Sequence, residues 1–223
     1  MTNRDVELGS VLRAFVRVAY TESLTVATTS LLFVLGSLPL ITAGSAFVAI
    51  VEVWTETVLA ESEGRRLRER ERAGRFVEAW LANLRAGVPY SAVLLVAMTG
   101  LVAYRRLSVV TGDALFFLWT LVGLYAVVVV AVWLLRAASI RVRAAGDPPR
   151  FIAAMRRAGY SLLEEPSFTV LTIVGAGIVC LLGLVSPPVF VVVGPGLLAA
   201  GEVVGFEELF GDSAAAIRAA YAA

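Results

Sequence analysis

The chain has 223 residues, of which 59% are hydrophobic and only 17% are charged, whereas soluble domains carry about 25% charged residues. It has no histidine, no lysine and one cysteine, and its net charge is +1. These counts exclude histidine-dependent catalysis, histidine-containing metal sites, lysine-dependent nucleotide chemistry and an internal disulfide, and we expect no cofactor, no metal and no nucleic-acid partner.

Four long stretches contain no acidic or basic residue: 23–51, 86–104, 114–135 and 166–201. A helix of about 20 apolar residues is enough to span a bilayer. The last stretch is too long for one helix, and Ser186-Pro187-Pro188 marks the turn that divides it. The sequence therefore predicts an all-α, polytopic membrane bundle that forms a single domain over residues 1–223. Its six predicted spans are 24–41, 43–60, 88–104, 114–135, 167–186 and 188–205.

The second of these spans is marginal, because it contains Glu52 and Glu56 and a charged residue at a helix centre costs about 2.5–3.5 kcal/mol. The arginines favour its crossing. With six spans, 17 of the 19 arginines fall on one side and only Arg105 and Arg106 on the other; without 43–60, the best arrangement leaves five on the second side. Since cytoplasmic loops are rich in arginine, we expect three hairpins in the plasma membrane, with both termini cytoplasmic.

The predicted cytoplasmic segments 61–86 and 148–164 contain apolar residues at helical spacing, with arginines between them. Such helices lie in a membrane interface, and we expect Phe76, Trp80 and Phe151 to anchor them. Arg75-Phe76-Val77 and Arg150-Phe151-Ile152 each open such a segment ahead of a hairpin, with a fainter parallel at Arg13-Ala14-Phe15. This pattern suggests three repeated units of an interfacial helix followed by a hairpin.

Three acids stand out as functional candidates. Glu52 and Glu56 lie one turn apart on one helical face, and Glu202 lies in the last span. Acids within a membrane are costly and mark proton or substrate routes. The alternative for Glu56 and Glu202 is a position near the interface, paired with an arginine such as Arg17 or Arg85.

Gly194-Pro195-Gly196 interrupts the last span, where the sequence allows either a broken helix that exposes carbonyl groups or a simple kink.

The stretch Gly36-Ser37-Leu38-Pro39-Leu40-Ile41-Thr42-Ala43-Gly44-Ser45-Ala46 resembles the opening signature of the YesL-like family of small membrane proteins. In that family an uncharged helix ends in a similar turn, followed by a small-residue helix, a charged stretch and an amphipathic segment. Pro39 is expected to stop the first helix, Thr42 to cap the next, and Gly44 to allow close approach. The resemblance implies an accessory role in carbohydrate uptake.

Two functions remain open at this point. The favoured one is a non-enzymatic membrane accessory protein whose partners are the lipid bilayer and a sugar transporter or other membrane protein. The alternative is a small secondary transporter that uses Glu52 as its coupling carboxylate, in which case a water-filled pocket should reach this residue. An enzyme is the least favoured reading, since acid–base chemistry would depend on carboxylates and arginines alone. The sequence indicates no oligomeric state.

Overall fold

The computed structural model describes residues 8–211 and 213–221, and within these ranges every regular element is helical, which confirms the all-α prediction. In chain order the helices are α1 (Leu8–Thr21), α2 (Ser23–Ser37), a 3-10 turn (Leu40–Thr42), α3 (Ala43–Ser62), α4 (Glu69–Ala82), α5 (Leu84–Thr111), α6 (Ala114–Val142), α7 (Phe151–Glu164), α8 (Pro166–Val185), α9 (Pro187–Phe210) and α10 (Ala214–Ala220).

Five stretches in the described residues are long and apolar enough to cross a membrane. They are the 3-10 turn together with α3, and the helices α5, α6, α8 and α9. The sixth predicted span is the exception. Helix α2 has 15 residues, which at 1.5 Å per residue is about 22 Å, short of a hydrocarbon core of about 30 Å. The count reaches six only if α1 and α2, bent by 81° at Glu22, form one span. The marginal segment 43–60 does lie in a candidate span, and 83% of that span's most apolar window is buried inside the protein.

A three-unit architecture is visible along the chain. Three times, a 14-residue helix is followed after a single residue by a hairpin of two longer helices. The single break residues are Glu22, Asn83 and Glu165. The order of elements is that of the suggested repeat. The two similar sequence motifs that suggested it, however, do not lie at equivalent positions in their helices. Arg75 lies in the middle of α4, whereas Arg150 precedes the first residue of α7.

The three units close into a ring. The second helices of the hairpins, α3, α6 and α9, pack against one another at the centre. Each of them also packs against the first two helices of the next unit: α3 against α4 and α5, α6 against α7 and α8, and α9 against α1 and α2. Helix α3 is therefore enclosed by protein on most sides, which explains how a helix containing two glutamates can sit in the core.

Two of the three interfaces between units share one polar contact. The backbone N–H of Gly44 donates to Ser91 Oγ at 2.7 Å, joining α3 to α5, and the N–H of Gly196 donates to Ser30 Oγ at 2.8 Å, joining α9 to α2. Each serine is the eighth residue after the break in its own unit. Helix α9 runs unbroken from Pro187 to Phe210, so the broken-helix alternative at Pro195 is wrong.

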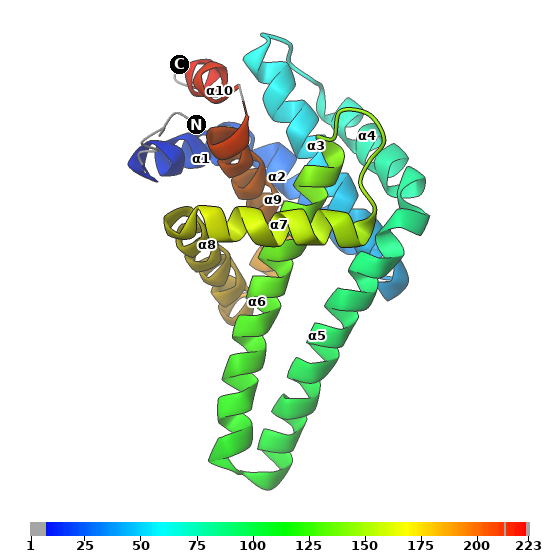
Figure 1. Ribbon diagram of the computed structural model, residues 1–223, viewed down its shortest axis with the longest axis vertical. Helices are drawn as coiled ribbons and strands as arrows, with labels where there is room; N and C mark the ends of the chain where they lie inside the picture. Colours follow the sequence, from blue (N-terminus) through cyan, green and yellow to red (C-terminus); the bar gives the residue numbers. More distant parts are fainter. Residues whose placement is uncertain (1–7, 212, 222–223) are drawn as a thin grey trace.

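The molecule has two unlike ends (Figure 1). The connections α3–α4 and α6–α7, together with α1 and α10, gather at one end, while the α5–α6 turn projects from the other. We call the first of these the Arg-rich end, comprising residues 63–75, 136–150, 202–211 and 213–221. Opposite it, the distal halves of α5 and α6 are exposed and, apart from Arg105 and Arg106, mostly apolar; Val109 and Val110 of α5 and Phe117 and Leu118 of α6 are among their exposed side chains.

Candidate functional site: polar clusters at the Arg-rich end

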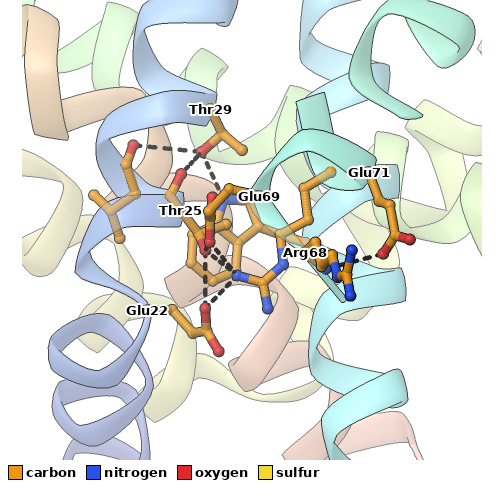
Figure 2. Close-up of polar contacts among 9 residues, drawn as sticks. Glu22, Thr25, Thr29, Arg68, Glu69 and Glu71 are labelled. Atoms are coloured by element: carbon orange, nitrogen blue, oxygen red, sulfur yellow. Dashed lines mark hydrogen bonds and ion pairs between the residues drawn. The ribbon is translucent and has the colours of Figure 1, made fainter. Parts of the chain in front are cut away.

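The first polar cluster joins the α1–α2 break to α4 (Figure 2). Arg72 is buried, and its Nη1 contacts the Glu22 carboxylate and the Thr25 hydroxyl and lies 2.7 Å from Glu69 Oε1. The Thr25 hydroxyl lies 2.8 Å from Glu22 Oε2 and 2.9 Å from Glu69 Oε1, so it can donate to either carboxylate. Because α4 carries Arg72 and Glu69, this cluster fixes α4 to the first unit.

The cluster continues into the core through threonines. Thr29 donates its hydroxyl hydrogen to the Thr25 carbonyl oxygen at 2.7 Å, and Trp54 Nε1 donates to Thr29 Oγ1 at 3.2 Å. Trp54 belongs to α3 and is fully buried. The chain of contacts thus connects α4, α2 and α3. No local sequence pattern predicts this contact, because Glu22 and Arg72 are 50 residues apart.

The second cluster is a buried ion pair between α6 and α9. Arg136 Nε lies 2.6 Å from Glu202 Oε1, and Nη2 lies 3.3 Å from Oε2. Both side chains are almost completely enclosed. The guanidinium carbon also lies 5.5–5.8 Å from three aromatic ring centres, those of Phe168, Phe206 and Phe210. Charge neutralisation and the electron-rich ring faces both stabilise the buried cation.

A neighbouring pair extends this cluster toward the Arg-rich end. Arg143, directly after α6, pairs with Glu207 of α9, and its guanidinium carbon lies 5.0 Å from the Phe206 ring centre. Burial lowers the pKa of Arg143 to about 10, while Glu202 acts in the opposite direction. The side chain therefore remains charged at neutral pH.

The third cluster lies around the two acids of α3. A cleft of about 380 Å³, which we call the α3 cleft, is lined by Glu52, Thr55 and Glu56 of α3, Asn83 of the α4–α5 break, and Arg141 of α6, and the α6–α7 connection closes its other side. Asn83 Nδ2 lies 3.5 Å from Glu52 Oε2, at the long limit of a hydrogen bond.

The three predicted acids do not form one site. Glu52 and Glu56 share the α3 cleft, whereas Glu202 belongs to the separate α6–α9 pair. Pairing with arginine does occur for Glu56 and Glu202, but the partners are not Arg17 or Arg85. Arg75 lies 3.8 Å from the half-exposed Glu56, and Arg136 pairs with Glu202. Arg136 directly follows the charge-free stretch 114–135, and Glu202 directly follows the charge-free stretch 166–201. These matching positions are the sequence feature that could have predicted the pair.

The predicted interfacial anchors face the protein. Phe76 of α4 is buried in the hydrophobic core, which contradicts its expected role as an interface anchor. Trp80, half-buried, packs against that core beside Gly36. Phe151 at the start of α7 meets Tyr90 edge-on, with ring centres 4.7 Å apart. The aromatic positions on these helices pack on neighbouring helices because one face of each amphipathic helix lies against the preceding unit of the ring.

The turn motif also differs in detail from its expected roles. Helix α2 ends at Ser37, two residues before Pro39. Thr42 precedes α3, but its hydroxyl makes no cap to that helix; it donates backward, to the carbonyl oxygens of Gly36 at 2.6 Å and Pro39 at 2.8 Å. Gly44 lies against the backbone of Gly87, close enough that a Cβ atom there would come within 2.0 Å of the Gly87 oxygen.

Comparison of the chain with models of protein families, with curated proteins and with solved structures finds no match. The resemblance to the YesL-like family therefore stays a prediction that rests on the turn motif. Among residues 8–211 and 213–221, no three acidic or cysteine side chains are arranged to hold a metal ion.

Proposed function

We propose that the protein is a non-enzymatic integral membrane accessory protein of the plasma membrane, with both termini and the Arg-rich end in the cytoplasm. The main support is the distribution of charge along the fold. Seventeen of the 19 arginines would fall on one side, and 11 of these 17 belong to the Arg-rich end. The exposed apolar surfaces of α6 and of the part of α5 before Arg105 would then lie in the hydrocarbon.

The outer face of α4 is the contact surface that this proposal assigns to a partner. Val77 and Leu81, respectively 43% and 54% exposed, lie one turn apart on this face. They are bordered by the exposed Arg70 and Glu78. An apolar centre with a charged rim is the composition of protein–protein interfaces. The partner that the YesL-like resemblance favours is a carbohydrate uptake transporter.

Affinity purification in mild detergent from cells grown on a glycan tests this proposal. We expect subunits of a carbohydrate transporter to co-purify with the wild-type chain and to be lost with Val77→Asp combined with Leu81→Asp. The control carries Ile152→Asp and Leu163→Asp on α7, which are more exposed apolar residues outside the proposed surface. Recovery of the wild-type chain alone, or equal loss of the transporter in both variants, contradicts the assignment.

A second candidate function is a small secondary transporter, and the α3 cleft is the observation that favours it. Glu52 reaches a space of about 380 Å³, as a coupling carboxylate must. Toward the start of α3, Gly44 packs closely against the backbone of Gly87, so no space separates α3 from α5 at that level. Solute flux into proteoliposomes that is abolished by Glu52→Gln would support this function, and unchanged flux would remove the role of Glu52.

A further inference from the structure

The α3 cleft contains two charged groups that no described residue neutralises by direct contact. Glu56 is paired with Arg75 on the outer rim. Glu52 and Arg141 make no ion pair within the described part of the chain. Arg141 Nη1 donates to the Pro149 carbonyl oxygen at 3.0 Å, which fixes its position without cancelling its charge. One carboxylate and one guanidinium therefore line the same space without touching.

A third polar group beside the cleft also lacks a partner. Thr55 lines the cleft, is only 6% exposed, and its hydroxyl makes no hydrogen bond within the described structure. Threonines on helices commonly satisfy this group on a carbonyl of the preceding turn, as Thr29 does on Thr25. The Thr55 hydroxyl oxygen is itself enclosed by protein, so the charged groups that line the cleft without an ion pair are the Glu52 carboxylate and the Arg141 guanidinium.

We propose that the α3 cleft binds a small zwitterion. Its ammonium group pairs with Glu52, and its anionic group pairs with Arg141. A ligand with both charges satisfies both isolated groups at once, whereas a simple amine or a simple carboxylate leaves one of them unpaired. The volume of about 380 Å³ suits a molecule of amino-acid size. This inference does not depend on the proposed contact with a transporter, which uses a different surface.

Titration of the purified full-length chain with ω-amino acids of increasing length tests the proposal. The probes differ in the distance between their ammonium and carboxylate groups, so the length that binds best reports the separation of the two binding groups in the cleft. The probes are glycine, β-alanine, 4-aminobutanoate and 6-aminohexanoate, with butylamine and butanoate as matched single-charge probes. Binding is followed by calorimetry and by the shift in thermal unfolding. We expect one length to bind best, at least tenfold more tightly than either single-charge probe.

Variants assign the two contacts. We expect Glu52→Gln and Arg141→Gln each to weaken binding of the preferred zwitterion at least tenfold, and Thr55→Val, which removes an enclosed hydroxyl, to leave it unchanged. Glu78→Gln is the matched control, since Glu78 lies beside Glu56 outside the α3 cleft. Failure of every zwitterion to bind the wild-type chain, binding of butylamine as tightly as the best zwitterion, or affinities unchanged in both cleft variants would overturn the proposal.

The same pair of charges occurs in the headgroup of phosphatidylethanolamine. Repeating the titration in phosphatidylglycerol nanodiscs with and without phosphatidylethanolamine separates the two sources. Competition by the lipid supports the headgroup as the natural occupant, and equal affinities in both nanodiscs support a free zwitterion.

Discussion

Arg136 and Glu202 illustrate, at the scale of single residues, how an apolar bundle accommodates charge. Both side chains are shielded from solvent, and each neutralises the charge of the other through two contacts. Removing one partner of such a pair leaves an isolated buried charge, which costs about 3–5 kcal/mol, while replacing both by apolar residues is often neutral.

We therefore expect Arg136→Met to lower the thermal unfolding midpoint strongly in detergent. The double variant Arg136→Met with Glu202→Leu should recover much of the lost unfolding midpoint, because it leaves no isolated buried charge. The measurement is a double-mutant cycle on the purified chain, with circular dichroism at 222 nm as the probe. Additive losses in the double variant would mean that the two residues stabilise the fold independently.

Tyr221, directly after α10, gives a prediction about pH. Burial, followed by the nearby acids Glu22 and Glu61, raises the pKa of its phenol above the usual value of about 10. The folded state thus favours the neutral phenol. The resulting stability is complete below pH of about 10 and is lost as pH rises toward the folded pKa, because the unfolded chain then ionises first.

The expected outcome for Tyr221→Phe is a smaller fall in the unfolding midpoint between pH 9 and pH 11 than for the wild-type chain. At pH 7 the variant should be as stable as the wild type, since the Tyr221 hydroxyl has no hydrogen-bond partner in the described structure. Parallel pH profiles for the two proteins would show that the phenol does not contribute to alkaline unfolding.

At the scale of helices, two glycines set how closely neighbouring units approach. A Cβ atom on Gly44 would lie 2.0 Å from the oxygen of Gly87, and one on Gly196 would lie 2.5 Å from the oxygen of Val26. Both neighbours are backbone atoms, which cannot rotate away. The helix axes must therefore move apart to accept a methyl group, and the serine contacts beside both glycines would be lost with this movement.

Gly44→Ala and Gly196→Ala should each lower the unfolding free energy by about 1–3 kcal/mol, the usual cost of overpacking. Gly100→Ala on α5 is the control, because nothing lies within 4 Å of the new methyl group. There the replacement should be neutral or stabilise by about 0.5–1 kcal/mol, since alanine favours a helix. Chemical unfolding in detergent compares the three variants; equal effects at all three positions would contradict the packing argument.

The same elements indicate how far the sequence predicts the structure. Charge-free stretches located the long helices well, because apolar length is a local property. The shortness of α2 was hidden, since the stretch 23–51 continues without a charge through the turn into α3. The backward hydrogen bond of Thr42 depends on how the turn closes, which spacing does not reveal. The pairing of Arg136 with Glu202 depends on which helices become neighbours. No local sequence pattern predicts that arrangement of the units.

At the scale of the whole molecule, the proposed topology requires the Arg-rich end and the α5–α6 turn to face opposite compartments. Both carry exposed positions suitable for labelling: Arg66 and Ala145 at the Arg-rich end, and Thr111 at the turn. Cys180, the one native cysteine, is half-buried within α8 and is first replaced by alanine. Single cysteines at the three exposed positions then report the compartment of each end.

In intact cells, an impermeant maleimide should modify Thr111→Cys and leave Arg66→Cys and Ala145→Cys unmodified. All three should react after the cells are permeabilised, which shows that the last two are accessible and only shielded by the membrane. Because six spans return the chain to its starting side whereas five do not, one further labelled position shows whether α2 crosses. A cysteine added after Ala223 is protected together with position 66 in either case. The deciding position is therefore a cysteine added at the N-terminus. Its protection supports six spans, and its modification supports five.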